Sequence, residues 1–383
     1  MEPSYDYLIV GGGVMGASFA SALLGKGKRV ALCERYTRPS GGSVRNFGLG
    51  WPFLVSQWSD LSLGLRTREI HMDLARHFDF GLDPSGALLV AGTEIEEAVL
   101  TDFQAASGGQ GLSSQWLDGK AALARQPLLN PAATRGGLFI PEASMLDPRI
   151  FTERWLAWMA EQRGLAYFPA TTVTGIGETS GGLTVRIAGG ASMLTGEVLI
   201  CGGEEFQTLF PQTFVESGIR RCKLAMLQTE PLGLRPGTPG LAFGRSLAHY
   251  PLFASSPSFE RLRAAPTDPA CDRLGIHLLV KPCPDGSVVI GDSHEYSAPD
   301  EPPDFDYTAE VEALLVQLTS RHLQIGTLHP ARRWLGYYAK HPEKPWLGAH
   351  PMPGVTIVTG LTIGMSAGPA FAERMVAAWL GRA

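Results

Sequence analysis

Residues 5–34 decide the fold, and they read YDYLIVGGGVMGASFASALLGKGKRVALCE. Residues 5–10 are a short β-rich run, residues 14–24 a stretch of small and apolar side chains typical of a buried helix, and residues 29–33 a second apolar run. The segment at 25–27, which contains two glycines, is expected to end the helix. A strand, a helix and a strand in this order predict a parallel sheet buried beneath helices.

The turn between the first strand and the helix carries the motif GxGxxG over residues 11–16. Gly11 permits the tight turn, Gly13 lets a pyrophosphate approach the backbone, and Gly16 lets the helix lie close to the strand. The free N–H groups at the start of the helix, together with the helix dipole, then favour the phosphates. The sequence therefore predicts a dinucleotide site whose residues at this turn are Gly11, Gly13, Val14, Met15 and Gly16.

A carboxylate follows the second strand. Glu34 lies 18 residues after Gly16, where it can accept hydrogen bonds from a ribose diol and would repel a 2′-phosphate. NADP is thus disfavoured, and we expect Glu34 and the adjacent Arg35 to lie against the cofactor. The motif alone does not distinguish FAD from NAD.

The composition of the 383-residue chain indicates a globular protein of two domains, with 44% hydrophobic and 18% charged residues. The formal net charge is −5, and Lys and Arg are scattered along the sequence, which argues against a nucleic-acid-binding protein. No window approaches the roughly 20 apolar residues of a membrane span. No basic leader precedes the apolar run 7–10, so we expect neither a secretory signal nor a membrane partner.

The five cysteines are widely spaced and form no CxxC pair. This pattern argues against a disulfide framework and against a zinc site. The sequence therefore predicts no metal ligands and a reducing, cytoplasmic location. It leaves the oligomeric state open.

The rest of the chain extends the opening plan. Residues 147–164 have a helical pattern, and residues 275–280 and 287–291 indicate a hairpin. The end of the chain repeats the opening order, with a strand over 355–359, a glycine-rich turn, and a helix from about 366 to 380. The two ends of the chain are therefore expected to build one nucleotide-binding domain, with a second domain inserted between them.

Several further segments stand in an informative order: SGGSVRNFG at 40–48, Val173 in the predicted strand 171–176, VLICGG at 198–203, WLG at 334–336, and the glycine-rich turn 360–368. Together with the opening motif they resemble the D-amino acid oxidase superfamily, on the branch of glycine and sarcosine oxidases. The resemblance covers nearly the whole chain and implies FAD as the cofactor.

The resemblance also implies a role for each matched segment. Residues 40–48 resemble the family's second FAD loop, Val173 the position whose backbone meets the adenine, and residues 198–203 the strand and glycines that close over the cofactor. Residues 360–368 resemble the last glycine turn, at the flavin's pyrimidine end. The further cofactor-binding residues implied are Ser43, Arg45, Asn46, Phe47, Gly48, Val173, Cys201, Gly202, Gly203, Leu361, Thr362, Ile363, Gly364, Met365 and Ser366.

The expected fold is α/β, a Rossmann-type FAD-binding domain with an inserted α+β substrate domain built on a mixed antiparallel sheet. We expect residues 1–80, 145–220 and 330–383 to form the FAD-binding domain. Residues 81–144 and 221–329 are expected to form the substrate domain.

Three positions depart from the family pattern. No Cys lies in 334–338, where sarcosine oxidases attach the flavin, so the resemblance implies noncovalent FAD. Val288 and Val289 stand where those enzymes place an oxygen-activating Lys, which leaves the electron acceptor open between oxygen and another molecule. Tyr338 stands where glycine oxidases carry the Arg that grips the substrate carboxylate, so that clamp is missing.

Four short segments look closer to a subgroup associated with phosphonate catabolism: SVRNFGLGWP at 43–52, CKLAMLQTE at 222–230, GDSHEY at 291–296 and RWLGY at 333–337. This implies oxidation of a C–N bond in a small anionic amine, 2-aminoethylphosphonate or its N-methyl form, to an aldehyde and ammonia or methylamine. The alternatives are a glycine, sarcosine or D-amino acid oxidase or dehydrogenase, a 2-hydroxy acid dehydrogenase, and a flavin-binding subunit without catalysis.

Cationic and hydrogen-bonding residues near the family-like turns are the candidates for substrate binding. Arg332 and Arg333 can bind an anion bidentately, but strand alternation sends them to opposite faces, so at most one contacts the substrate directly. Either could instead form a surface salt bridge. We predict no catalytic base, because the flavin accepts the hydride and the protein supplies position. The predicted substrate-binding residues are Arg332, Arg333, Tyr337, Tyr338, His249, Tyr250, His294 and Lys223.

Overall fold

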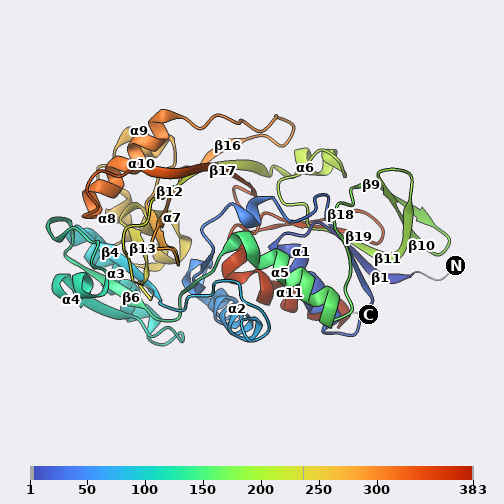
Figure 1. The fold of residues 1–383 in the computed structure, drawn as a ribbon, viewed down its shortest axis with the longest axis horizontal. Helices are drawn as coiled ribbons and strands as arrows, with labels where there is room; N and C mark the ends of the chain where they lie inside the picture. The colour runs from blue at the N-terminus through green and yellow to red at the C-terminus, as the bar shows by residue number, and fades with distance from the viewer. Residues whose placement is uncertain (1–3, 236, 382–383) are drawn as a thin grey trace.

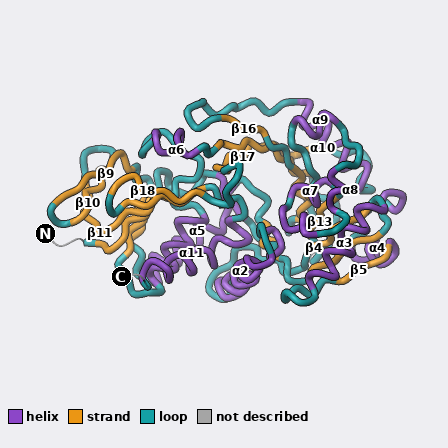
Figure 2. The backbone as a smooth tube through the Cα atoms, turned by 180° about the vertical axis from the view of Figure 1, so that it is seen from behind, coloured by secondary structure: helices purple, strands orange, loops and turns teal. Residues whose placement is uncertain are grey.

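The computed structural model describes residues 4–235 and 237–381; residues 1–3 and 382–383, at the two ends of the predicted FAD-binding domain, lie outside them. Two large sheets build most of the molecule, and Figure 1 shows them at opposite ends. The view from behind in Figure 2 shows the same division, with one group of strands toward each end, helices between the two groups and further helices around the second group.

The first sheet has eight strands and contains the predicted strand–helix–strand unit. In order they are β18 (Leu347–Met352), β19 (Val355–Thr359), β11 (Ser192–Ile200), β1 (Tyr5–Val10), β2 (Val30–Cys33) and β8 (Ala166–Phe168), with β10 (Gly182–Ile187) paired to β11 and β9 (Val173–Thr179) paired to β10. Strand β1 is parallel to both β11 and β2, and β19 and β8 extend the parallel run. The carboxyl ends of these strands therefore share one edge, where the glycine turns follow.

Three helices cover one face of this sheet: α1 (Val14–Leu24), α5 (Pro148–Gln162) and α11 (Gly364–Leu380). The first and last of them lie side by side although they come from opposite ends of the chain (Figure 1). Ile9 of the sheet belongs to one buried cluster with Phe19, Phe151 and Phe371 of the three helices. The small residues of α1 allow this close approach, since most of them are buried.

The second sheet has nine strands and is mostly antiparallel. Its order is β16 (Glu295–Ser297), β12 (Arg220–Thr229), β15 (Val288–Gly291), β14 (Leu279–Pro282), β13 (Gly240–Phe243), β4 (Ala87–Ala91), β6 (Gly136–Ile140) and β5 (Gln115–Asp118), with β17 (Pro330–Lys340) also paired to β12. Only the β13–β4 pair is parallel among its described pairs. The predicted mixed α/β fold with mixed sheets is confirmed.

Short helices surround the second sheet, and a third, two-stranded sheet lies near the junction. The helices are α3 (Glu94–Ser107), α4 (Gly119–Arg125), α7 (Arg245–His249), α8 (Phe259–Arg263), α9 (Pro269–Arg273) and α10 (Ala309–His322). Helix α2 (Leu61–Leu74) packs against α11, β3 (Leu49–Gly50) contacts α11 and pairs with β7 (Ser144–Met145), and α6 (Pro211–Ser217) precedes β12.

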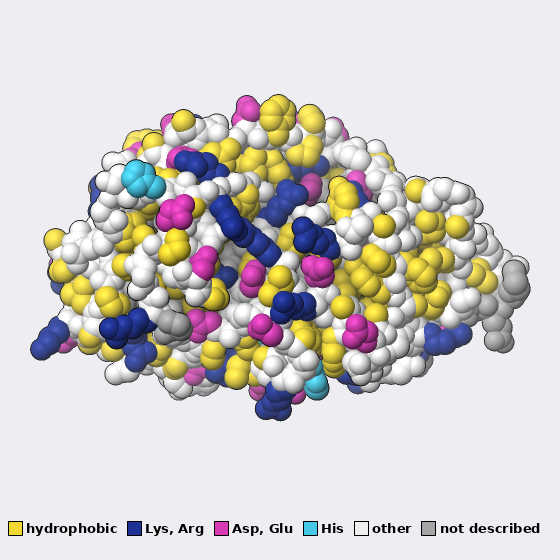
Figure 3. All heavy atoms as spheres, in the orientation of Figure 1, with side chains coloured by type: hydrophobic (Ala, Val, Ile, Leu, Met, Phe, Trp, Pro, Cys, Tyr) yellow, Lys and Arg dark blue, Asp and Glu magenta, His cyan; other side chains and the backbone are white. Residues whose placement is uncertain are grey.

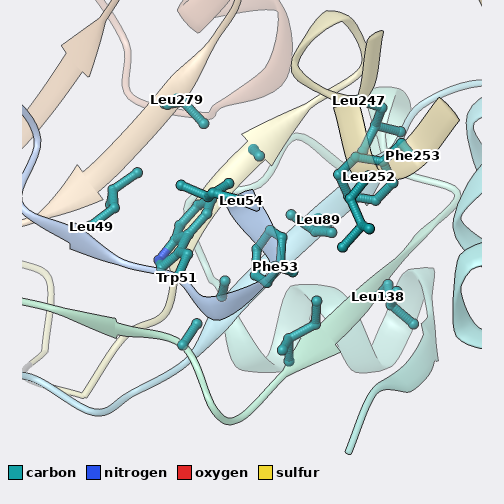
Figure 4. Close-up of a cluster of buried hydrophobic side chains, with 14 of the residues drawn as sticks. Leu49, Trp51, Phe53, Leu54, Leu89, Leu138, Leu247, Leu252, Phe253 and Leu279 are labelled. Carbon is teal, nitrogen blue, oxygen red and sulfur yellow. The ribbon is translucent and has the colours of Figure 1, made fainter. Parts of the chain in front are cut away.

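A cluster of aromatic side chains packs the segment after β3 against the second sheet and the segment after α7. Trp51 and Phe53 stack with ring centroids 5.3 Å apart, and Phe53 meets Phe253 edge-on at 6.4 Å. Figure 4 shows Phe53 close to Leu252 and Phe253, which come from the segment directly after α7. Burying rings of this size stabilises the junction by several kcal/mol, on the order of 2 kcal/mol for each side chain. The end of α7 is thereby fixed in place.

Strand β17 belongs to the second sheet, whereas the prediction placed residues 330–383 in the FAD-binding domain. It pairs antiparallel with β12 along its whole length, with Cys222 opposite Tyr338 and Leu227 opposite Arg333. The sheets therefore divide the chain after residue 340, one strand later than predicted. The predicted bounds of β1, α1 and β19 agree with the structure.

Charged side chains of both signs are interspersed on the face shown in Figure 3, with apolar side chains between them. This distribution agrees with the scattered Lys and Arg of the sequence. Within residues 4–235 and 237–381, no helix is long and apolar enough to cross a membrane.

Candidate functional site

A cavity of about 410 Å³ lies between the two sheets and is lined by residues of both. Every predicted cofactor-binding residue except Gly16 lines it. So do five of the predicted substrate-binding residues: His249, Tyr250, His294, Tyr337 and Tyr338. The structure thus brings the two predicted sets together in one site.

The first glycine turn forms the floor of the cavity. Gly11 has a φ of +105°, and a side chain there would collide with the carbonyl oxygen of Cys201. Gly16 does not face the cavity, because its Cα lies against the backbone of Gly11 and a side chain would strike that carbonyl oxygen. The two glycines therefore shape the turn from opposite sides, as the motif predicts.

The carboxylate of Glu34, which follows β2, forms a hydrogen bond with this turn. Its Oε2 accepts a hydrogen bond of 2.8 Å from the backbone N–H of Gly12, and its Oε1 accepts one of 3.0 Å from the N–H of Tyr36. Glu34 also lines the cavity and is 7% exposed. It is therefore positioned both to hold the turn and to receive a ribose diol.

The loop over residues 40–48 lies across the start of α1. Ser43 Oγ accepts a hydrogen bond of 2.9 Å from the N–H of Val14. The side chain of Asn46 donates to the carbonyls of Gly42 and Ser43 and accepts from the N–H of Gly48. Asn46 therefore shapes the loop, which leaves the loop backbone to line the cavity.

A cluster of titratable side chains forms the opposite wall. His249, His277 and His294 have ring centroids 4.1–5.1 Å apart. Asp292 lies beside them, with Oδ1 3.4 Å from Nε2 of His277 and Oδ2 3.8 Å from Nε2 of His294. The ring of Tyr250 meets His277 edge-on, and that of Tyr338 meets His294 edge-on.

Burial controls the charge of this wall. It raises the pKa of Asp292 to about 8 and lowers the pKa of His294 to about 4. Burial also holds the pKa values of His249 and His277 well below the usual range, with a further contribution from the neighbouring imidazoles. The pKa values of the two phenols, Tyr250 and Tyr338, are well above their usual range for the same reason. Near neutral pH the imidazoles are uncharged and the phenols can donate hydrogen bonds.

Residues 6–379 match the family described as DAO, FAD dependent oxidoreductase. The chain belongs to this family. FAD is therefore the cofactor of this oxidoreductase, as the resemblance implied.

Curated relatives match parts of this DAO-family chain. It is 32% identical over 211 residues to the glycine oxidase of Geobacillus kaustophilus, which covers 53% of this chain and 55% of the relative. It is 29% identical to one subunit of the anaerobic glycerol-3-phosphate dehydrogenase of Escherichia coli K12, over 51% of this chain and 35% of the relative. A third match, 25% identical, is to the L-2-hydroxyglutarate dehydrogenase of Salmonella houtenae, over 75% of this chain and 63% of the relative. The matched stretches thus span from about a third to somewhat under two thirds of these relatives.

Solved structures share the fold over nearly the whole chain. The glycine oxidase of Geobacillus kaustophilus superposes with a TM-score of 0.77 at 21% identity, covering 99% of this chain and 95% of the other. The L-proline dehydrogenase of P. horikoshii superposes with a TM-score of 0.80 at 18% identity, covering 100% and 94%.

The side of the cavity formed by the glycine turns and the loop over residues 40–48, which we call the cofactor wall, fits FAD. A Cβ added to Gly13 would come 2.9 Å from Ser43 Oγ and meet no other atom within 3.8 Å, so the glycine keeps the start of α1 open. When bound, FAD accepts the hydride of the oxidised substrate. Gly364 and Met365 at the start of α11 line the same cavity, so a second helix N-terminus faces the cofactor site.

Three predicted substrate-binding residues lie elsewhere. Only residues 336–340 of β17 line the cavity, because the strand extends beyond it, and Arg332 and Arg333 lie on the part that extends. Arg333 instead pairs with Glu312 at the surface, with its Nη2 2.7 Å from Oε1. Lys223 is buried in an ion-pair cluster with Asp304 and with Glu295, whose Oε1 is 3.1 Å away. The structure therefore does not bring these three cations into the cavity.

Two wall residues of this oxidoreductase were missed by the sequence analysis. His277 lies between α9 and β14, and Asp292 follows β15. Nothing in the spacing of residues 249, 277 and 292–294 indicates that they meet. Only the antiparallel pairing of β14 with β15, which places Leu279 opposite Gly291, brings His277 next to Asp292.

Proposed function

We propose that this enzyme oxidises the C–N bond of a small amine with an anionic head, an aminoalkylphosphonate such as 2-aminoethylphosphonate or its N-methyl form. A hydride leaves the carbon next to the nitrogen, the resulting imine takes up water, and the products are an aldehyde and ammonia or methylamine. FAD is held noncovalently, since residues 334–338 contain no Cys. The electrons then pass to oxygen or to another acceptor.

The composition of the cavity wall carries this proposal. The position of the glycine oxidase carboxylate clamp holds Tyr338 instead of a guanidinium fork, and Tyr250 on the same wall offers a second, separate donor. The phenols of Tyr250 and Tyr338 stay protonated and can donate. A phosphonate has three oxygens, which suit several dispersed donors better than a carboxylate does.

A positive charge near the same wall supports an anionic head. Lys340 lines the cavity. Its ammonium group lowers the pKa of Asp292 and also those of His249 and His294, so the field of its charge reaches the wall residues. A neutral amine and an anionic oxygen can therefore be held together between this wall and the flavin.

The relatives support amine oxidation but keep a second candidate open. A glycine oxidase is the relative of highest identity among those reported above, and an L-proline dehydrogenase shares the fold. The match to L-2-hydroxyglutarate dehydrogenases runs over 75% of the chain and favours oxidation of a 2-hydroxy acid as the second candidate. Both reactions need the same hydride acceptor and differ in the atom that carries the departing proton.

Anaerobic bleaching of the flavin tests the proposal directly. The substrates to compare are 2-aminoethylphosphonate, its N-methyl form, glycine, sarcosine and L-2-hydroxyglutarate. We expect one of the two phosphonates to bleach the flavin fastest. Faster bleaching by glycine or sarcosine would refute the phosphonate head, and bleaching only by the hydroxy acid would establish the second candidate. A flavin that none of them reduces would refute both candidates.

A further inference from the structure

We propose that His249, His277, His294 and Asp292 form a binding site for a divalent transition-metal ion inside the cavity. Each histidine offers a ring nitrogen, and these nitrogens all lie within 4.8 Å of one another. The residues come from three separate segments: the end of α7, the residues before β14 and the residues after β15. His277, Asp292 and His294 are 3%, 7% and 8% exposed, so the site is enclosed by protein except toward the cavity.

Hydrogen bonds behind the rings fix which nitrogen carries the proton. The hydroxyl of Ser246 donates to the carbonyl of Leu278 at 2.9 Å, so toward His277 the same oxygen accepts from Nδ1–H at 3.0 Å. Nδ1–H of His294 donates to the carbonyl of Gly275 at 3.0 Å. In both neutral rings Nε2 therefore carries a lone pair. This arrangement, with an Nδ1–H held from behind and a free Nε2, is typical of metal-binding histidines.

The free lone pairs of His277 and His294 face the carboxyl group of Asp292. Nε2 of His277 and Oδ1 of Asp292, 3.4 Å apart, both lack a hydrogen-bond partner among the described residues. Each of these buried polar atoms, left without a partner, keeps the cost of its desolvation. A cation placed between them removes this cost for both at once. The geometry therefore calls for a positively charged occupant.

The donor set selects the kind of cation. Three imidazole nitrogens and one carboxylate oxygen suit Zn²⁺ and neighbouring first-row ions such as Co²⁺ and Fe²⁺, whereas Mg²⁺ and Ca²⁺ prefer oxygen ligands. The cysteines contribute nothing here, which is why their spacing gave no sign of a metal site. The open side of the ion would face the cavity and could take an oxygen of an anionic substrate. This last role rests on the proposed function, whereas the metal site itself does not.

Zinc retention by the FAD-loaded protein tests the site without any substrate. The protein is freed of metal with a chelator, incubated with Zn²⁺, passed through a desalting column and analysed by inductively coupled plasma mass spectrometry. We expect about one zinc per chain in the wild type and in His350→Ala, whose histidine is exposed on β18. His277→Ala and His294→Gln should retain almost none. Their flavin absorbance shows that they still fold.

A variant behind the site separates a metal site from simple loss of structure. Ser246→Ala keeps all four ligands but removes the acceptor of the His277 Nδ1–H. Such outer partners change metal affinity by about 10- to 100-fold, which competition with a chromogenic chelator measures. An unchanged affinity in Ser246→Ala, no zinc in the wild type, or equal zinc in His277→Ala and His294→Gln would each overturn the site. Bleaching by 2-aminoethylphosphonate without zinc retention would refute the metal site and support the proposed function. Zinc retention without bleaching by either phosphonate would support the metal site and refute the proposed function.

Discussion

The two walls of the cavity are built in different ways. The cofactor wall consists of the glycine turns and the loop over residues 40–48, each continuous in sequence, and its side chains Glu34 and Asn46 form hydrogen bonds with neighbouring N–H and carbonyl groups. The wall around Asp292 is made of side chains, and it places unpaired polar atoms of His277 and Asp292 in a buried position. The two named side chains of the cofactor wall have hydrogen-bond partners within the protein, whereas Nε2 of His277 and Oδ1 of Asp292 have none among the described residues.

From this difference we infer that one wall binds the cofactor and the other the substrate. A wall of glycine turns and helix N-termini binds phosphate groups through N–H groups whose positions the fold determines. A wall with unpaired buried polar atoms is costly without a partner, so it suits a ligand that supplies the missing contacts. Substitutions in the first wall should therefore change cofactor content, and those in the second should change substrate rates while the cofactor stays.

The largest expected effect is complete loss of FAD in Gly13→Val. The new side chain would occupy the space of the pyrophosphate, while within the protein it meets only Ser43 Oγ at close range. The flavin-to-protein absorbance ratio should fall to near zero, with the far-UV circular dichroism spectrum unchanged. Gly108→Ala is the matched control, because a Cβ there meets no atom within 4 Å. Full FAD content in Gly13→Val would contradict the assignment of the turn.

The cofactor wall was predictable from the sequence because its determinants are local. Gly11, Gly13 and Gly16 do their work within one strand–turn–helix unit, so the spacing alone specifies the geometry. Short-range patterns also predicted β1, α1 and β19 with their bounds. The later glycine turns were found through the resemblance to a family.

The substrate wall was only partly predictable because it depends on pairing between distant strands. His249, Tyr250 and His294 were identified from loops near family-like turns, but His277 and Asp292 carry no local pattern. Charged residues misled for a related reason. The partners of Arg333 and Lys223, Glu312 and Asp304, lie 21 and 81 residues away in the chain, and a sequence does not show that such a charge is already paired.

A smaller effect is expected from Tyr338→Phe, which should change kcat/KM without changing FAD content. Loss of one hydrogen bond to an anionic head costs about 1.5–3 kcal/mol, which corresponds to roughly a 10- to 100-fold fall in kcat/KM for an aminoalkylphosphonate. FAD content should not change. An uncharged amine of similar size should lose far less. Equal losses for both substrates would show that Tyr338 acts by packing alone.

A buried histidine outside the cavity tests whether acid sensitivity belongs only to the substrate wall. His71 of α2 packs against Phe80 and Phe151, and neither of its nitrogens has a hydrogen-bond partner among the described residues. Burial lowers the pKa of His71 to about 4 from its ordinary value of 6.5. The unfolded chain therefore takes up a proton as the pH falls below 6.5, while the folded chain does so only near pH 4, and stability is lost between these values.

The expected share of His71 at pH 5 is about 2 kcal/mol of the free energy of unfolding relative to pH 7 and above. In His71→Leu the fall in stability between pH 7 and pH 5, measured by urea denaturation, should shrink by about this amount. The rest of the fall should remain, since the wall imidazoles are still present. An unchanged pH dependence in His71→Leu would mean that His71 takes up its proton in the folded state as readily as in the unfolded chain.

The smallest expected effect is that of Arg333→Ala. It tests whether the part of β17 outside the cavity contributes to substrate binding. Arg333 lies outside the cavity and forms an exposed ion pair with Glu312, a kind of pair that adds little to stability. Both kcat/KM for the aminoalkylphosphonates and FAD content should stay within about twofold of the wild type, since no contact with the ligand is lost. Glu312→Ala should behave in the same way, because it breaks the same pair from the other side. If Arg333→Ala lowered kcat/KM for anionic amines but not for uncharged ones, and Glu312→Ala did not, Arg333 would have to leave Glu312 and reach the substrate. The donors around Tyr338 would then not account for binding of the anionic head by themselves, and Arg333 would supply a further cation.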